Sequence, residues 1–527
     1  MFLTLRDLLL GSAARFGPRP AVRLRDAELS FEDLATRSSR LAHVLAAQGL
    51  KPGDRVAIMV HGDIRQLEPY GAAALGGFVS VVVNHRLSAT EVGRLLDDCG
   101  ARALVYSHSV LKTVRQVATH DLCLIALDDD ESAQGYESRL ASAAATPPDI
   151  VVAADDTAAI SYTSGTTGRP KGATFTHGQL MAATSAQAHV SRFSPYGRVA
   201  FAGSLSFGAA LAGMVYPSLA TGSTLRMFDQ LTPDSWFEAL RQDRATFTNV
   251  PTPLMGDLVE WLRDDRAVLA HLETISHSGA PAQRGIVQEL TELCGPRFME
   301  VWGMTECGGT PLTATTRSDL VPPREADDIL TSVGRPTPYV ELNLVDDQGR
   351  ELPPGSDAIG EFVVTCASMM KGYWQAPELT RTVLHGQSYR TGDLGRIDAA
   401  GYVYLVGGRR SEMIVSGGMN VYPAEVESVL LAHPAVAAAA VFGVPHERWG
   451  EAVAAAVQLA PEAPHVGEAE LVEYVRQHIA TYKKPQRIHF VAEMPRTATL
   501  KVNRALLREQ VAALPWPAAR GQQSHAR

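Results

Sequence analysis

The chain has 527 residues, of which 46% are apolar and 20% are charged. This length exceeds what one small core needs, so we expect two or more domains. Lys and Arg number 48 and Asp and Glu 57, and the net charge of −9 argues against a nucleic-acid-binding protein. The five cysteines lie far apart without CxxC or Cys/His metal spacing, which predicts reduced thiols in a cytoplasmic protein.

Two segments bear on export and membranes. The N-terminus, "MFLTLRDLLLGSAARFG", has charges within its apolar run and lacks the cleavage site of a signal peptide. Residues 199–225 contain no charge and are long enough to span a bilayer. They are rich in Gly, Ser and Thr, and Pro217 interrupts them. We therefore predict a buried helix with flanking loops. A membrane span is the less favoured alternative.

The first part of the chain alternates strands and helices. Ser30 is a candidate N-cap for a helix whose apolar stripe comprises Leu34, Leu41, Val44 and Leu45. Residues 54–60 and 78–83 read as buried strands. This rhythm persists past residue 300 and predicts a mostly parallel sheet covered by helices. Residues 142–156 read as a surface linker.

From about residue 335 the pattern changes to short alternating runs. Residues 339–365 read as a hairpin, with turn residues between its two runs. A small α+β unit follows, beginning with a helix near Pro423, a good first helical residue. It continues with strands at 435–444 and 452–460, a helix at 468–480 and a strand at 487–494.

The segment "ISYTSGTTGRPKGATF", residues 160–175, is a glycine loop between strand-like runs. It is not a Walker A loop, because Gly172 follows Lys171 where that motif requires Ser or Thr. It is not a Rossmann fingerprint either, because it opens no helix. Consecutive N–H groups, several hydroxyls and one lysine nevertheless favour phosphate binding. A polar hairpin turn is the alternative, although it would need fewer hydroxyls.

Residues 162–172, "YTSGTTGRPKG", resemble the phosphate loop of the adenylate-forming enzymes, which include acyl-CoA synthetases, NRPS adenylation domains and firefly luciferase. The resemblance covers residues from about 5 to 510. It implies a loop that closes on the β- and γ-phosphates of ATP. The loop residues expected to contact the nucleotide are Thr163, Ser164, Gly165, Thr166, Thr167, Gly168 and Lys171.

Two further segments match the family in order and spacing. In "VWGMTE", residues 301–306, the resemblance assigns adenine stacking to Trp302, α-phosphate binding to Thr305 and Mg²⁺ binding to Glu306. Taken alone, such a Thr-Glu pair is usually a solvated turn or a helix cap. "SGAP", residues 278–281, matches the segment that lines the adenine and acyl sites. The additional contacts expected from these two segments are Gly279, Ala280, Pro281, Gly303 and Met304.

The later family motifs are also present. Asp393 matches the carboxylate that binds both ribose hydroxyls, and Arg409 matches a ribose-contacting arginine. Gly417 and Gly418 match the backbone that lines the pantetheine tunnel. Lys501 falls on the catalytic lysine. The chain departs from the family at the hinge, where Ser411 stands for Asp or Lys, and at Leu500, where glycine is usual.

The fourth core motif bears on the acid. Amino-acid-activating relatives carry an Asp there, whereas this chain has Gly208 after Phe207, so we expect a plain carboxylic acid. Small residues could make a roomy pocket, or they could pack tightly against a helix, which is at least as good an interpretation. The expected pocket residues are Phe207, Gly208, Gly279, Gly303, Met304 and Gly309.

The resemblance implies an α/β fold with a large N-terminal domain of parallel sheets covered by helices plus a small β-barrel-like part, and with a small mobile α+β C-terminal domain. We assign residues 1–408 to the N-terminal domain, 409–412 to a hinge, 413–514 to the C-terminal lid domain and 515–527 to a disordered tail.

The implied activity is that of an AMP-forming acyl-CoA synthetase, an acid–thiol ligase of fatty acid or secondary metabolism that uses ATP, Mg²⁺ and CoA. A carrier protein could replace CoA, the chain could perform only the thioester-forming half-reaction, or it could be a non-catalytic nucleotide-binding regulator. We expect a monomer or a homodimer without nucleic acid or membrane partners.

Overall fold

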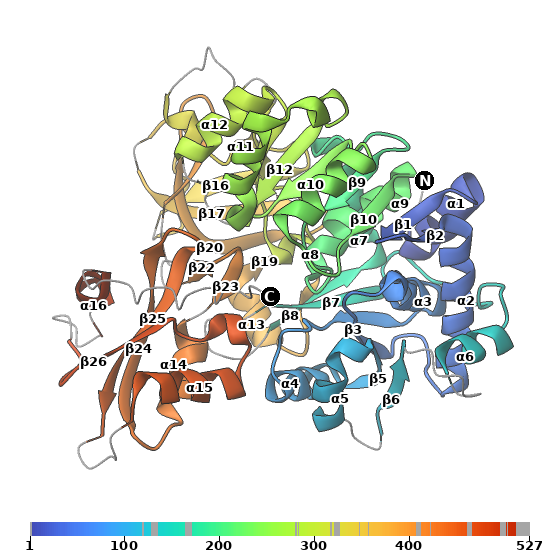
Figure 1. Cartoon of the computed structure of the whole chain (residues 1–527), viewed down its shortest axis with the longest axis horizontal. Coiled ribbons are helices and arrows are strands. Elements are labelled where there is room, and N and C mark those ends of the chain that lie inside the picture. Colours follow the sequence, from blue (N-terminus) through green and yellow to red (C-terminus); the bar gives the residue numbers. More distant parts are fainter. Residues whose placement is uncertain are drawn as a thin grey trace, which may run out of the picture. The chain divides into compact units, whose positions relative to one another are not determined.

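The computed structural model describes residues 3–117, 121–127, 135–163, 171–279, 282, 284–316, 319–320, 327–346, 348–356, 358–406, 413–421, 423–460, 466–495, 502 and 504–512. These residues form two compact units, which meet in sequence between residues 406 and 413 (Figure 1). The expected hinge at 409–412 and the tail at 515–527 lie outside the described residues, so the domain boundaries stay predictions.

The first unit contains a seven-stranded sheet that carries the glycine loop. Five neighbouring strands of this sheet, from β7 to β6 in the order below, run parallel. At the β7 edge, β8 pairs antiparallel with β7, and β18 pairs antiparallel with β8. Long apolar runs such as Val79–Val82 are buried, as expected for strands covered on both faces. In sheet order the strands are β18 (Gly372–Tyr373), β8 (Lys171–Thr176), β7 (Thr157–Thr163), β4 (Val79–Val82), β3 (Arg55–Met59), β5 (Ala101–Tyr106) and β6 (Cys123–Ala126).

A nine-stranded sheet forms the other half of this unit. Its six central strands are parallel, and antiparallel pairs lie at both edges. The predicted parallel architecture is thus confirmed for the centres of both sheets. In sheet order the strands are β15 (Arg335–Pro336), β14 (Thr313–Ala314), β13 (Phe298–Trp302), β12 (Thr274–Ser278), β11 (Phe247–Val250), β9 (Arg198–Phe201), β10 (Thr224–Met227), β1 (Pro20–Leu24) and β2 (Ala27–Ser30).

Helices connect the successive strands and pack around the two sheets (Figure 1). The hydroxyl of Ser30 accepts from the N–H of Asp33 and caps α2, whose predicted stripe is buried. The helices are α1 (Leu5–Phe16), α2 (Phe31–Ala47), α3 (Glu68–Gly76), α4 (Ala89–Cys99), α5 (Leu111–Val117), α6 (Tyr136–Ser142), α7 (His177–Val190), α8 (Gly208–Ala210), α9 (Tyr216–Thr221), α10 (Pro233–Gln242), α11 (Met255–Asp264), α12 (Arg284–Cys294) and α13 (Pro377–Val383).

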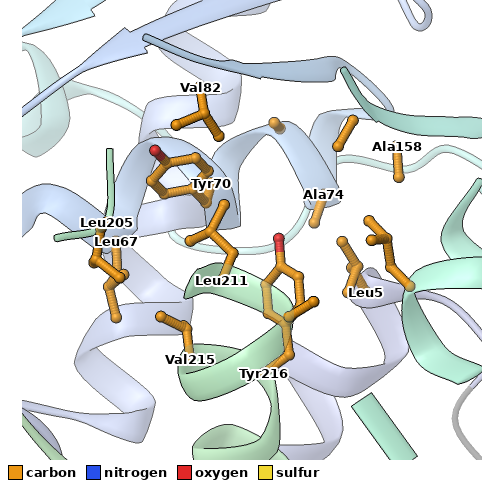
Figure 2. Close-up of a cluster of buried hydrophobic side chains, with 14 of the residues drawn as sticks. Leu5, Leu67, Tyr70, Ala74, Val82, Ala158, Leu205, Leu211, Val215 and Tyr216 are labelled. Carbon is orange, nitrogen blue, oxygen red and sulfur yellow. The ribbon is translucent and has the colours of Figure 1, made fainter. Parts of the chain in front are cut away.

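The uncharged segment 199–225 contains a helix in the core of the first unit. Helices α8 and α9 are joined by one π-helical turn at Leu211–Val215. Figure 2 shows Leu211 and Tyr216 of this segment among Leu5 of α1 and Tyr70 of α3, all of them buried. The predicted buried helix is therefore confirmed, but its flanks include β9 and β10 as well as loops. No helix within the described ranges is long and apolar enough to cross a membrane.

The expected hairpin at 339–365 is present in a separate five-stranded antiparallel sheet. Strands β16 (Val340–Val345) and β17 (Gly360–Cys366) pair directly, and β20 (Ser388–Ile397) extends the sheet. Two shorter strands, β19 (Leu384–His385) and β21 (Val403–Val406), pair with β20. All five cysteines of the chain lie in the described residues, and none of them forms a disulfide bond.

The second unit is the expected small α+β fold. One of the two buried clusters among its described residues lies where α14 and α15 cover one face of a five-stranded sheet, with Val426, Leu471 and Val457 fully buried. Its elements are β22 (Ile414–Ser416), β23 (Met419–Val421), α14 (Pro423–Leu431), β24 (Val436–His446), β25 (Gly450–Leu459), α15 (Glu468–His478), β26 (Arg487–Phe490) and α16 (Arg504–Ala512).

Candidate active site

The carboxyl ends of three neighbouring parallel strands define one edge of the nine-stranded sheet. Strands β11, β12 and β13 lie side by side, so the residues that follow them meet at this edge. Gly279 follows β12, and Gly303 to Glu306 follow β13. Open α/β sheets bind ligands outside the carboxyl ends of their strands. The fold thus places Ser278, Gly279 and the predicted segment 301–306 at a suitable edge. Ala280 and Pro281 lie outside the described residues.

Glu306 lies in a single tight turn, Thr305–Cys307, and its side chain is almost fully buried. The Tyr373 hydroxyl donates to Glu306 Oε1 at 2.9 Å, and the Met370 N–H donates to the Glu306 carbonyl at 2.8 Å. Within the described part of the chain, no three His, Cys, Asp or Glu side chains form a metal cluster. A lone carboxylate suits Mg²⁺ that arrives with nucleotide phosphates, since Mg²⁺ usually takes only one or two protein carboxylates.

The glycine loop closes the hairpin of β7 and β8. Thr163 and Lys171 face each other across the two strands, so the loop starts and ends at one point. The intervening contacts predicted at Ser164, Gly165, Thr166, Thr167 and Gly168 lie outside the described residues. The Lys171 ammonium lies 5.7 Å from the centre of the Tyr373 ring, because β18 pairs with β8.

Tyr373 is therefore a further residue of the candidate site, and no sequence motif indicated it. It contacts both the turn that carries Glu306 and the lysine that ends the glycine loop. The only sequence signal was the Gly-Tyr-Trp run at 372–374, which reads as an ordinary short strand. Nothing local indicates a contact with a residue 67 positions earlier.

Trp302, the predicted adenine-stacking residue, is buried at the end of β13. Its ring packs against Phe362 of β17, with 5.3 Å between the ring centres and 56° between the planes. This contact links the carboxyl edge of the nine-stranded sheet to the antiparallel sheet that carries Asp393. The stacking role itself stays a prediction.

Asp393 is held in an irregular part of β20. Gly392 has φ of +74°, in the left-handed region, and its N–H donates to Glu361 Oε1 at 3.0 Å. The Asp393 N–H donates to the Thr391 hydroxyl at 3.0 Å, which itself donates to the Phe362 carbonyl. The sequence Thr-Gly-Asp thus fixes the backbone that carries the Asp393 carboxylate. Arg409, its expected partner at the ribose, lies outside the described residues.

Several predicted pocket residues are small because other atoms approach them closely. A Cβ on Gly208 would lie 2.0 Å from Ser161 Oγ, and one on Gly309 would lie 3.1 Å from the Ala209 carbonyl. These contacts join α8 to β7 and to the Thr305–Gly309 turn. Phe207 is 43% exposed, whereas Met304 is buried. The tight-packing interpretation therefore describes Gly208 and Gly309 better than a roomy pocket does.

Gly417 and Gly418 form the two-residue turn between β22 and β23 in the second unit. Their φ angles of +58° and +78° are both in the left-handed region. A two-residue hairpin turn of this kind requires glycine or a close substitute at both positions. The turn alone accounts for this pair, so the predicted pantetheine contact stays a prediction. Lys501 lies outside the described residues.

A buried pair of side chains, His277 and Glu300, lies near the carboxyl ends of β12 and β13, and no sequence motif indicated it. His277 Nδ1 is 2.8 Å from the Glu300 carboxylate, and its Nε2 is 2.9 Å from the Thr252 hydroxyl. His277 and Glu300 are buried on β12 and β13. Burial raises the pKa of the Glu300 carboxyl, and the His277 ring opposes that rise. The contact between His277 and Glu300 joins the end of β12, just before Gly279, to the neighbouring strand β13.

The family models match both units of the chain. The AMP-binding enzyme model matches residues 10–374, and the model of the AMP-binding enzyme C-terminal domain matches residues 425–501. The chain belongs to the AMP-binding enzyme family. This confirms the predicted adenylate-forming superfamily and the predicted enzyme class, an AMP-forming acid–thiol ligase.

This AMP-binding enzyme is similar to characterised relatives over most of its length. A feruloyl-CoA synthase of an Amycolatopsis species is 33% identical over 94% of this chain and 97% of its own. The long-chain-fatty-acid–CoA ligase FadD13 of Mycobacterium tuberculosis is 33% identical over 93% of this chain and 94% of its own. The amide bond synthetase McbA of Marinactinospora thermotolerans is similar in structure, with a TM-score of 0.86, 30% identity and coverage of 95% and 99% of the two chains. These comparisons confirm the predicted fold class.

The glycines of the α8–α9 segment make a paired test of packing in this AMP-binding enzyme. We expect Gly208→Ala to destabilise the enzyme by about 1–3 kcal/mol, because the new methyl would also lie 2.8 Å from Ser161 Cβ. Gly213→Ala is the matched control, since nothing lies within 4 Å of its Cβ position. Thermal unfolding measures both variants. Equal melting temperatures for the two would contradict the packing account.

Proposed function

We propose that this enzyme activates a carboxylic acid with ATP to an acyl-adenylate and then transfers the acyl group to the thiol of CoA. A carboxylate is a poor acyl donor, because its leaving group would be oxide. A carboxylate oxygen attacks the α-phosphorus of ATP, and pyrophosphate leaves. The thiol then attacks the acyl carbon, and AMP leaves with the electron pair of the broken C–O bond.

The first step brings two anions together, and the residues assigned to it are cationic or donate hydrogen bonds. Lys171 and the loop hydroxyls would hold the β- and γ-phosphates, and Thr305 would hold the α-phosphate. Glu306 would hold Mg²⁺, which supplies positive charge to the phosphates when bound. Lys501 would place a mobile cation between the carboxylate and the α-phosphate, since lysine is a compact charge on a long stem.

The observation that supports this proposal most directly is the contact of Tyr373 with both Glu306 and Lys171. The two phosphate-binding segments predicted separately, at residues 160–175 and 301–306, thereby share one neighbour. The order of the motifs and the family match over both units support the same assignment.

For the second step we propose that the C-terminal domain turns about the hinge at 409–412. Lys501 would leave the reacting atoms, and the turn at Gly417 and Gly418 would take its place beside the pantetheine arm. Movement of a whole domain between two catalytic conformations is an established way to use one site for two reactions.

The proposal also names the class of carboxylic acid that is activated and the acceptor of the acyl group. The similarity to a feruloyl-CoA synthase and to a long-chain-fatty-acid–CoA ligase supports an aryl or alkyl acid and CoA. Gly208 provides no partner for a substrate ammonium, which disfavours amino acids. A carrier-protein thiol remains an alternative acceptor, and the similarity to McbA adds an amine as a third.

One experiment tests acid, acceptor and mechanism together. The enzyme is incubated with ATP, Mg²⁺ and a panel of alkyl, aryl and polycyclic acids, in parallel with CoA, a phosphopantetheinylated carrier protein or an amine. Mass spectrometry detects the adenylate and the final product. We expect an adenylate from one class of acid in every arm and a thioester only with CoA. A carrier thioester or an amide alone would identify a different acceptor, and no adenylate with any acid would contradict the first step.

A further inference from the structure

Tyr373 lies on a five-residue segment that contacts both phosphate-binding parts through its backbone. The Met370 N–H donates to the Glu306 carbonyl at 2.8 Å. The Lys371 N–H donates to the Thr174 carbonyl at 2.8 Å, and the Trp374 N–H donates to the Gly172 carbonyl at 2.7 Å. The segment 370–374 therefore connects the turn of Glu306 to the strand that begins at Lys171. Its position is fixed at both ends by main-chain hydrogen bonds.

The Tyr373 hydroxyl is part of a directed chain of hydrogen bonds. It lies 2.9 Å from Glu306 Oε1 and 3.3 Å from the Tyr389 hydroxyl. The single hydrogen of the Tyr373 hydroxyl goes to Glu306, so the Tyr389 hydroxyl is the donor to Tyr373. All three side chains are buried. Oε1 is thereby oriented, and Oε2 is the oxygen through which Glu306 can bind a cation.

The ring of Tyr373 provides a second contact. The Lys171 ammonium lies 5.7 Å from its centre, within the range of a cation–π interaction. The same side chain thus orients an anionic group with its hydroxyl and faces a cationic group with its ring.

We propose that Tyr373 is a positioning residue for the adenylation step, holding Glu306 and Lys171 at the spacing that the metal-bound triphosphate of ATP requires. This inference rests on the proposed roles of Glu306 and Lys171 in ATP binding. The alternative is a purely structural role, in which loss of the Tyr373 hydroxyl lowers the stability of the enzyme and leaves ATP binding unchanged.

Measuring ATP binding in the absence of acid and CoA distinguishes the positioning role of Tyr373 from a purely structural one. The dissociation constant of ATP is measured by equilibrium titration at several Mg²⁺ concentrations for the full-length enzyme and for Tyr373→Phe. Mg²⁺ lowers the dissociation constant of ATP by some factor in the wild-type enzyme, and we expect that factor to be about 10-fold smaller in Tyr373→Phe. This change corresponds to the loss of one hydrogen bond to a charged group. The affinity for ATP without Mg²⁺ should stay within about 2-fold, because the ring beside Lys171 is retained. Tyr373→Leu should weaken that affinity as well.

Tyr402→Phe is the matched control, because its buried hydroxyl also donates to a carboxylate, Asp319 Oδ1, at 3.0 Å. It should lower the melting temperature without changing the Mg²⁺ response. In a Glu306→Gln background, Tyr373→Phe should add no further loss, since it acts through Glu306.

An unchanged Mg²⁺ response in Tyr373→Phe would overturn the inference, as would an equal change in Tyr402→Phe or an additive loss in the double variant. If the wild-type enzyme showed no Mg²⁺-dependent ATP binding, the proposed function itself would fail. If Glu306→Gln abolished that dependence while Tyr373→Phe kept it, only the role of Tyr373 would be wrong.

Discussion

Lys501→Ala is expected to slow adenylate formation by about 10²–10³-fold, the usual effect of removing one preorganised charge or donor from a developing anionic centre. Lysine would neutralise the approaching carboxylate and α-phosphate, and alanine leaves their repulsion uncompensated. The measurement is acid-dependent exchange of labelled pyrophosphate into ATP, which reports the first step without any thiol.

The same variant should keep the second step. Synthetic acyl-adenylate with CoA should yield thioester at a rate within about 3-fold of wild type, because the proposed second step places Lys501 away from the reacting atoms. Lys484→Ala, which removes a half-buried lysine from the same unit, should change neither step. A Lys501→Ala enzyme with normal exchange, or with equal losses in both steps, would contradict the assigned role.

Glu306→Gln is expected to lower the pyrophosphate exchange rate by about 10²-fold at 1 mM Mg²⁺ or so, through loss of metal binding. Glutamine keeps the side chain's shape and can still accept from the Tyr373 hydroxyl, so packing should be retained. Raising Mg²⁺ should recover part of the rate. A thermal unfolding curve near that of wild type would separate this effect from misfolding.

Glu68→Gln is the control for that substitution. Glu68 is fully buried and also accepts from a tyrosine, Tyr136, at 2.6 Å, but it pairs with Arg37 and lies outside the predicted site. It should cost stability and leave the exchange rate of the folded enzyme unchanged. If Glu306→Gln kept both the exchange rate and its Mg²⁺ dependence, the metal would have to be held elsewhere.

Local pattern explains the parts of the fold that were predictable. Ser30 as a cap, the stripe of α2 and the uncharged helix around Leu211 follow from spacing and polarity in short windows. The alternation of elements predicted parallel sheets, since crossover helices place successive strands in one direction. The antiparallel pairing of β14 and β15 was not predicted, because strands of only two residues carry no sequence signal of their direction.

The site was predictable only where its residues belong to contiguous motifs. Thr305 and Glu306 stand together in the sequence, whereas the contact between Tyr373 and Glu306 depends on how β18 pairs with β8. The buried pair of His277 and Glu300 likewise depends on the register of β12 with β13. Tertiary pairing decides such contacts, and one sequence does not encode them locally.

Isotope transfer from the carboxylate tests the central claim most directly. The enzyme is supplied with an accepted acid labelled with ¹⁸O at both carboxylate oxygens, together with ATP, Mg²⁺ and CoA, and the nucleotide product is analysed by mass spectrometry. If the carboxylate attacks the α-phosphorus, the AMP released by the thiol carries one ¹⁸O and pyrophosphate carries none. Unlabelled AMP, or ADP with labelled inorganic phosphate, would contradict an acyl-adenylate intermediate.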